Sequence, residues 1–322
     1  MISSIIVTHN SEACVGACID ALARWLPETE ILVIDNASTD ASRAVAERHG
    51  AAVVALHENI GFGRACNVGA RRAENEHLLF LNPDVAIRSA DADGLAEMLG
   101  AADLGLVAPT SASSKFTFAE RSWIGETLSL TLGALWPREF SRRTPSPHDG
   151  QELWVSGAAL LVRKAEFLSV EGFDARYFLY YEDRDLSLRY RRSGLPVRTT
   201  PAIVADHVGG GSTNLGDRRP TALAFAMMGW LQYMHTARGA QTAARAWKLA
   251  REMHTVVTRF VNITARIVPT ARLRRKSLQL REVAQELETI RASSGVLEQS
   301  DAHAYWPDAV AVLGAARGNT TP

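Results

Sequence analysis

Short polar groups follow four successive apolar runs of the chain: Thr8-His9-Asn10, Asp35-Asn36, Asn59–Gly63 and Asn82-Pro83-Asp84. In an open α/β sheet, ligands bind beyond the carboxyl ends of the strands, so these groups are candidates for one binding site. Each group alone is explained equally well by turn and cap chemistry, because Asn, Asp and Gly favour both. Four groups in succession favour a site.

Two further residues have the chemistry of metal ligands. Asp84 ends an apolar run within LFLNPDV, where it could hold a divalent cation that is bound to a diphosphate. Hard oxygen ligands suit Mg²⁺ or Mn²⁺. His207 stands at the end of another run, in ADHVGGGST, and is a second candidate ligand. The alternatives stay open: Asp84 could cap the turn after Pro83, and His207 could be structural.

Two adjacent carboxylates, Glu182 and Asp183, open a predicted helix directly after the aromatic segment 177–181. Acidic residues in a first helical turn can simply complement the helix dipole. An aromatic wall can also desolvate a carboxylate and raise its pKa toward that of a general base. Asp183 and Glu182 are therefore candidate catalytic residues.

Apolar runs alternate with amphipathic stretches over the first hundred residues. Strands are predicted at 4–8, 31–34, 51–56, 77–81 and 104–108, with helices at 15–26, 38–50, 63–72 and 91–100. The runs are apolar throughout, as in parallel strands that are covered on both faces. The alternation predicts a doubly wound, mostly parallel α/β sheet. Later predicted elements are a strand at 153–162, a helix at 182–192 and a strand at 197–206. Gly157 within the first of these indicates a bulge or a close backbone approach.

The 322 residues divide into a domain at 1–215 and a helical, basic region at 216–322. Within the first, residues 1–109 and residues 110–215 are predicted to form two halves. The excursion at 110–150 loses the strand and helix rhythm, and long loops of this kind are often lids or binding loops. Its aromatic residues could line an acceptor site or anchor the loop: Phe116, Phe118, Trp123 and Trp136.

Composition excludes several classes of protein. Lys and Arg total 35, as do Asp and Glu, so a nucleic-acid binder is not expected. Three cysteines and no secretory signal favour a reducing compartment, the cytoplasm. No run is long and apolar enough to span a bilayer.

The segment 238–281 holds eleven Lys and Arg residues against one acidic residue, Glu252. Such a segment could meet anionic lipid at the inner face of the cell membrane. It could equally be a solvated helical face or a contact in a homo-oligomer. Loss of liposome binding on changing Arg272, Arg274, Arg275 and Lys276 to Ala would favour the membrane.

Seven ordered segments resemble a known family: IIVTHNS, VIDNASTD, ENIGFGRACNVGAR, LFLNPDV, WVSGAALLVRK, GFDARYFLYYEDRDLSLRYRRSG and DHVGGGST. Together they are similar to bacterial family 2 glycosyltransferases of the GT-A fold, most of all to the rhamnosyltransferase-like branch that builds envelope polysaccharides. The resemblance covers roughly residues 3–214. It implies a Rossmann-like nucleotide-binding half, an acceptor half and a C-terminal helical extension.

The resemblance implies a role for each matched residue. The nucleoside-binding positions of the family are matched by Thr8, Asn10, Asp35 and Asn36. Its nucleotide-side loop and helix are matched by Asn59, Gly61, Phe62, Gly63 and Asn67. Its DxD metal position is matched by Asn82 and Asp84, with Asn in place of the first Asp.

The acceptor half is matched in the same way. The floor between donor and acceptor is matched by Trp154, Ser156, Gly157 and Ala158, and Tyr181 is assigned to the same substrate-binding group. Glu182-Asp183 matches the family's ED motif, whose Asp is the expected base. His207 matches a histidine that completes the metal site in related galactofuranosyltransferases.

These matches imply an inverting glycosyltransferase that depends on Mg²⁺ or Mn²⁺. The implied donor is a nucleotide sugar, with dTDP-L-rhamnose the leading choice. The implied acceptor is a saccharide, on its own or linked to polyprenyl diphosphate. The alternative is a non-catalytic scaffold that binds nucleotide sugar, suggested by Asn82 in the metal motif. Nicotinamide-binding and P-loop interpretations are rejected, because the Gly61–Gly63 motif lacks its third glycine and Gly209–Gly211 has no following Lys.

Overall fold

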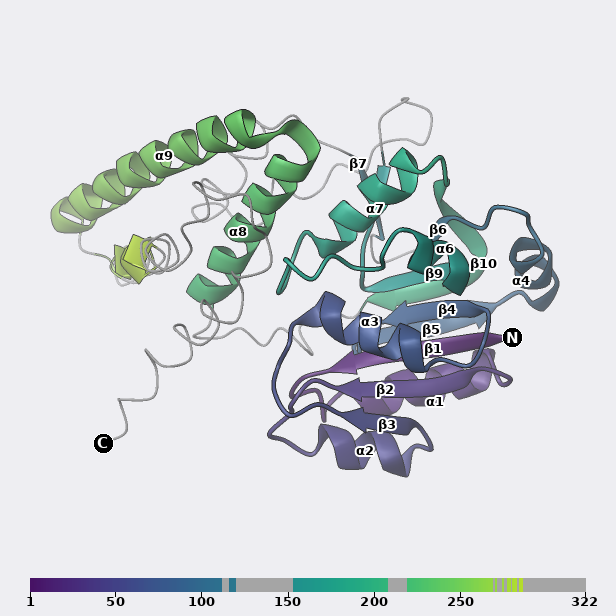
Figure 1. Cartoon of the computed structure of the whole chain (residues 1–322). Helices are drawn as coiled ribbons and strands as arrows, with labels where there is room; N and C mark the ends of the chain where they lie inside the picture. The colour runs from purple at the N-terminus through teal and green to yellow at the C-terminus, as the bar shows by residue number, and fades with distance from the viewer. Residues whose placement is uncertain are drawn as a thin grey trace. The chain divides into compact units, whose positions relative to one another are not determined.

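The computed structural model describes residues 1–111, 116–119, 153–207 and 219–268, with single residues between 270 and 285. The chain divides into two compact units. Unit 1 comprises residues 1–120 and 144–214, and unit 2 comprises residues 121–143 and 215–322 (Figure 1). Most of the predicted excursion at 110–150, including Trp123 and Trp136, lies outside the described residues, as does Gly209–Gly211.

The first half of unit 1 confirms the predicted alternation of strands and helices. Its parallel strands are β1 (Ile2–Thr8), β2 (Glu30–Asp35), β3 (Ala52–Ala55) and β4 (His77–Leu81). The helices that connect them are α1 (Val15–Trp25), α2 (Ser42–Arg48) and α3 (Phe62–Arg72). In the sheet, β1 lies between β2 and β4, and Thr8 is paired with Asp35. The predicted polar groups that follow β1 and β2 therefore lie at the same edge of the sheet.

The second half of the sheet is mixed. It is built from β5 (Val85–Ala90), β6 (Leu106–Thr110), β9 (Ala159–Arg163) and β10 (Val197–His207). The full order is β3-β2-β1-β4-β9-β6-β10-β5. β9 runs antiparallel to both β4 and β6, whereas β10 is parallel to β6 and antiparallel to β5. The predicted α/β sheet is confirmed, but its second half mixes parallel and antiparallel pairs, because an apolar run reports burial on both faces and not strand direction.

The predicted strand at 153–162 is wrong as a single element. Its first part is β8 (Leu153–Val155), which pairs with β7 (Thr117–Ala119) in a separate two-stranded sheet. Its second part is β9 in the main sheet. A turn at residues 156–158 separates them, and Gly157 lies within this turn instead of in a bulge. The run is continuous in hydrophobicity but changes sheets.

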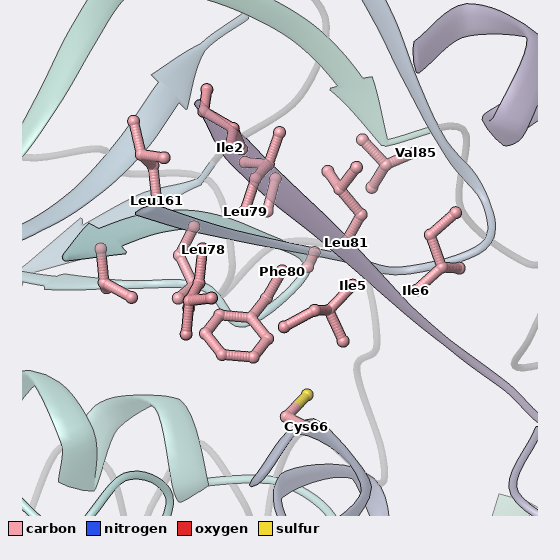
Figure 2. Close-up of a cluster of buried hydrophobic side chains, with 14 of the residues drawn as sticks. Ile2, Ile5, Ile6, Cys66, Leu78, Leu79, Phe80, Leu81, Val85 and Leu161 are labelled. Atoms are coloured by element: carbon pink, nitrogen blue, oxygen red, sulfur yellow. The ribbon is translucent and has the colours of Figure 1, made fainter. Parts of the chain in front are cut away.

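Three helices cover the remainder of unit 1: α4 (Ala92–Leu99), α6 (Lys164–Ser169) and α7 (Glu182–Arg192). α4 and α7 confirm two predicted helices. The core is centred on β1 and β4, where Ile5, Leu78 and Phe80 are fully buried. Figure 2 shows these side chains with Cys66 of α3 facing them. Burial raises the pKa of the Cys66 thiol well above its usual value, so this cysteine is a small core residue.

Unit 2 contains two long helices, α8 (Arg219–Arg238) and α9 (Ala240–Ile267), separated by Gly239. Trp230 of α8 and Trp247 of α9 are buried. The described part of the C-terminal region is therefore helical, as predicted. Among the described helices, none combines the length and apolar character that crossing a membrane requires. Three of the basic residues singled out in the sequence lie outside the described residues: Arg272, Arg275 and Lys276.

Candidate active site

The ends of β1 and β2 are joined by polar contacts. The Thr8 hydroxyl donates a hydrogen bond to Asp35 Oδ1 at 3.2 Å, and both side chains are buried. Asn10 follows in a left-handed conformation with φ 54°, and its side-chain oxygen accepts from the Thr39 N–H at 2.8 Å. The predicted nucleoside-binding residues therefore lie together at one edge of the sheet.

Asn36 and Asn59 tie the loop after β3 to the end of β2. Asn36 Nδ2 donates to Asn59 Oδ1 at 2.9 Å, while Asn36 Oδ1 accepts from the Ile60 N–H at 2.9 Å. Asn59 Oδ1 also accepts from the Gly61 N–H at 3.0 Å. The side-chain amides of Asn36 and Asn59 thus fix the conformation of the loop that precedes α3. A ligand at this edge would meet a preformed surface.

Gly61 is the point where the two halves of unit 1 meet. Its backbone has φ 87° and ψ 166°, a region that is essentially limited to glycine. A Cβ atom here would lie 2.4 Å from the Phe178 carbonyl oxygen. The same carbonyl accepts a hydrogen bond from the Phe62 N–H at 3.0 Å. The predicted Gly61–Gly63 loop is therefore fixed against the aromatic segment that precedes α7.

Asn67 has a structural role. Its Nδ2 donates to the Phe173 carbonyl at 2.7 Å, and its Oδ1 accepts from the Phe173 N–H at 2.9 Å. Both ends of the amide are thus bonded to one backbone position. These contacts anchor α3 on the segment before α7, and the nucleotide contact that the sequence implies for Asn67 stays a prediction.

Asp84 and His207 come together from distant parts of the chain. His207 ends β10, opposite Val85 at the start of β5, and its Nε2 lies 3.1 Å from Asp84 Oδ1. Asp84 is buried and His207 is partly exposed. A carboxylate oxygen and an imidazole nitrogen are a donor set that suits Mn²⁺, so the two residues fit the metal that the sequence implies.

Asp84 and His207 alone provide fewer ligands than a complete protein metal site. The described residues contain no cluster of three or more His, Cys, Asp or Glu side chains that could hold a metal. Asn82 stands where a full DxD motif has a second carboxylate. A divalent cation bound here would complete its oxygen shell with diphosphate and water.

Asp183 lies in the first turn of α7 and contacts the turn at 156–158. Its Oδ2 accepts from the Gly157 N–H at 2.9 Å, and its Oδ1 accepts from the Arg184 N–H at 2.7 Å. Burial raises the pKa of the Asp183 carboxyl, while these two hydrogen bonds oppose the rise. Asp183 remains partly exposed, so its carboxylate is accessible to a ligand.

Glu182 has the opposite environment. It is buried, and its Oε2 has no hydrogen-bond partner among the described residues. Burial raises the pKa of Glu182 to about 8, and the charges of Asp183 and Asp185 add to the rise. The buried environment therefore favours the neutral form of the side chain. Of the two predicted catalytic carboxylates, the structure leaves Asp183 as the one that faces outward.

The same turn contacts both candidate centres. The Asn82 N–H donates to the Ala158 carbonyl at 2.8 Å, next to the Gly157 bond to Asp183. Ser156 closes the turn, because its hydroxyl accepts from the Ala158 N–H at 3.2 Å. One turn of three residues therefore connects the loop of the candidate metal ligand to the candidate base.

Sequence comparison agrees with this arrangement. The family model described as glycosyl transferase family 2 matches residues 3–162, which include the turn and the ends of β1 to β4. The chain therefore contains a glycosyl transferase family 2 domain.

Two curated relatives of this glycosyltransferase domain are named as rhamnosyltransferases. An N-acetylglucosaminyl-diphospho-decaprenol L-rhamnosyltransferase of Mycobacterium tuberculosis is 30% identical over 202 residues, covering 55% of this chain and 66% of the relative. Rhamnosyltransferase WbbL of Escherichia coli K12 is 25% identical over 226 residues, covering 64% and 83%. The match thus spans just under two-thirds of the mycobacterial relative's length.

Solved structures show the same GT-A fold. The crystal structure of GalNAc-T7 with UDP, GalNAc and Mn²⁺ superposes with a TM-score of 0.52 at 14% identity. The match covers 79% of this chain and 55% of that one. At this identity the likeness concerns the fold alone.

The glycosyltransferase domain contains one site feature that the sequence reasoning missed. The guanidinium of Arg184 lies 5.9 Å from the Trp154 ring centroid and 5.6 Å from that of Tyr181. Trp154 in turn stacks on Phe118 at 4.5 Å between ring centroids. A cation between two rings fixes both aromatic residues. The available signal was a basic residue in the first turn of α7, where the helix dipole disfavours it.

Proposed function

We propose that this protein is an inverting, metal-dependent glycosyltransferase whose base is Asp183. The observation that carries the proposal is the turn at 156–158, which is hydrogen-bonded on one side to Asn82 and on the other to Asp183. A sugar donor held by a metal at Asp84 would have its departing diphosphate next to this turn. An acceptor hydroxyl at Asp183 would approach at the other end of the same turn.

Different residues of the site have different parts in the proposed transfer reaction. Asp84 and His207 would hold a divalent cation, which neutralises charge on a departing nucleoside diphosphate. Asp183 accepts the proton of the attacking hydroxyl, and its raised pKa suits that role. A single displacement at the anomeric carbon inverts its configuration. The residues at the ends of β1 and β2 hold the nucleoside.

The proposed donor is dTDP-L-rhamnose and the proposed acceptor is a saccharide linked to polyprenyl diphosphate. Support comes from the two rhamnosyltransferase relatives, one of which is named for transfer to N-acetylglucosaminyl-diphospho-decaprenol. Mn²⁺ in the GalNAc-T7 structure supports a divalent metal without choosing between Mn²⁺ and Mg²⁺. A lipid-linked acceptor places the reaction at the cytoplasmic membrane face, with the protein bound peripherally.

The alternative function is a scaffold that binds nucleotide sugar without transferring it. Asn82 in the metal motif motivates this alternative, because it leaves the site one carboxylate short. The two functions differ in turnover, and a scaffold would bind donor while transferring nothing to any acceptor.

Donor-binding calorimetry tests the proposal. With Mn²⁺ present, we expect one donor from a panel of dTDP-rhamnose, UDP-galactose, UDP-N-acetylglucosamine and GDP-mannose to bind. Binding should weaken at least about tenfold with EDTA or in Asp84→Ala, because the diphosphate then lacks its counter-charge.

The matched control is Asp93→Ala, which removes an exposed carboxylate of α4. This variant should bind donor like the wild type. Donor affinity that is unchanged by both EDTA and Asp84→Ala would contradict a metal at Asp84. Folded wild-type protein that binds no donor of the panel would contradict the proposed donor class.

A further inference from the structure

α9, the longest helix in Figure 1, has an exposed apolar stripe along one face. Its members are 65%, 68%, 56% and 74% exposed, and they are Val256, Phe260, Ile263 and Ile267. Their spacing of four, three and four residues places them on one side of the helix. Large apolar side chains that are singly exposed are ordinary, but a continuous stripe of them indicates an interaction surface.

The stripe is distinct from the face of α9 that packs within unit 2. A second apolar series is buried, at Ala243, Trp247, Ala250, His254, Val257 and Val261. On that side, the His254 ring contacts the Leu280 carbonyl at 3.1 Å. The helix is thus apolar on two faces, of which one is buried and the other is exposed in the described part of the chain.

Basic residues run along one flank of the stripe. Lys248, Arg259 and Arg266 are all exposed and recur at intervals that keep them on this flank. The same flank has a hollow lined by Trp247, Lys248, Arg251, Glu252, Thr255 and Val256. In the sequence, the surrounding segment 238–281 has eleven basic residues against one acidic residue.

We propose that this face of α9 docks onto a lipid bilayer rich in anionic phospholipid. An interfacial helix needs an apolar face that enters the boundary between headgroups and acyl chains, and basic residues beside it. The stripe provides the first, and Lys248, Arg259 and Arg266 provide the second. Each cation near an anionic surface adds favourable electrostatic free energy.

The charges favour lipid over a second copy of this chain as the occupant. An antiparallel pair of α9 stripes would bring the basic flank of one copy against the same flank of the other, where like charges repel. Anionic lipid neutralises this flank instead. The inference extends the membrane part of the proposed function, but it depends on no step of sugar transfer.

Vesicle co-sedimentation of the full-length protein tests the proposal. We expect binding to vesicles of phosphatidylcholine with phosphatidylglycerol and little binding to phosphatidylcholine alone. Phe260→Glu and Ile263→Glu should each weaken binding at least about tenfold, because a carboxylate then enters the apolar boundary. The matched control is Leu168→Glu on α6, where an apolar side chain 49% exposed lies in unit 1. This variant should bind like the wild type.

A charge variant and two further readouts complete the test. Arg259→Gln with Arg266→Gln should weaken binding to anionic vesicles and reduce its dependence on salt. Wild-type protein that ignores anionic vesicles, or Phe260→Glu that binds them normally, would overturn the proposal. So would a wild-type dimer in light scattering that Phe260→Glu dissociates without any vesicle binding. Donor calorimetry on Phe260→Glu should match the wild type, which separates failure at the membrane from failure of the proposed chemistry.

Discussion

Asp183 and Glu182 are adjacent in the sequence but have different surroundings. The first turn of α7 directs Asp183 to the backbone N–H of Gly157 and leaves it partly exposed. Glu182 is buried, with an oxygen that no described residue hydrogen-bonds. A carboxyl without a partner in a dry environment favours its neutral form. At the residue scale, the pair therefore consists of one partly exposed carboxylate, the proposed base, and one buried carboxyl that favours its neutral form.

Replacing Asp183 with Asn should abolish transfer and preserve donor binding. Asn keeps the size of the side chain and can still accept the Gly157 hydrogen bond, but it cannot take a proton. We expect kcat to fall by about 10²–10⁴ with donor affinity within twofold of the wild type. Transfer assays and calorimetry on the same protein check this. A variant with normal kcat would assign the base to another group.

The raised pKa of Glu182 predicts how stability depends on pH. The pKa is about 8 in the folded protein, against an ordinary value of 4.5. The contribution of the neutral Glu182 carboxyl to the free energy of unfolding is therefore fully present below pH 4.5. It declines as the pH rises toward 8 and is lost above pH 8. Glu182→Gln mimics the neutral form and should remove this decline. Unfolding free energies from denaturant titration at pH 5, 6.5, 8 and 9 check this, and parallel curves for the two proteins would contradict it.

The loops that meet at Gly61 and Gly157 assemble the site at the scale of elements. The ends of β1, β2 and β3 are tied together by Asn36 and Asn59. α3 is then fixed to the segment before α7 through the Phe178 carbonyl. The turn at 156–158 completes the assembly, because it contacts both Asn82 and Asp183. Apart from the bond between the Asn36 and Asn59 side chains, each of these contacts has a backbone group on at least one side, so the geometry depends on chain conformation as well as on side-chain identity.

Gly61→Ala should damage the site more than a matched substitution elsewhere. Gly239 has nearly the same backbone angles, φ 85° and ψ 162°, but a Cβ added there would have no atom within 4 Å. Gly239→Ala should cost about 1–3 kcal/mol of backbone strain. Gly61→Ala adds a clash with the Phe178 carbonyl, so it should cost more and also weaken donor binding. Denaturant titration and calorimetry compare the two, and equal effects would exclude the clash.

The whole molecule is divided into two units with separate tasks in the proposal. Every residue of the candidate site belongs to unit 1. The exposed stripe and its basic flank belong to α9 in unit 2. Nucleotide-sugar binding and membrane binding are therefore expected to respond to different substitutions.

A substitution within α8 tests this division. Trp230 is 1% exposed, so Trp230→Ala should destabilise unit 2 by about 3–5 kcal/mol through loss of a large buried side chain. Donor affinity should remain within twofold of the wild type, while vesicle binding should fall. Trp230→Phe retains most of the buried area and serves as the milder control. Loss of donor binding in a variant whose unit 1 stays folded would contradict the division.

Much of the fold could be predicted from the sequence because local physics decides it. Apolar runs located β1 to β4, and helical periodicity located α1 to α4. A strand that is buried on both faces is apolar throughout, and a helix that is buried along one stripe repeats apolar residues every three to four positions. The seven ordered segments indicated the family, which the match at residues 3–162 confirms. The roles of the individual site residues stay predictions, as do the domain ranges.

Only the tertiary structure decided what depends on residues distant in the chain. Hydrophobicity does not encode strand direction. The antiparallel direction of β9 and the division of residues 153–162 between two sheets could therefore not be predicted from it. The contact between His207 and Asp84 spans 123 positions and exists because β10 pairs with β5. The anchoring contacts of Asn67 with the Phe173 backbone span 106 positions and were likewise not visible in the sequence. The sequence determines which groups can do chemistry, and the packing of distant segments determines which of them meet.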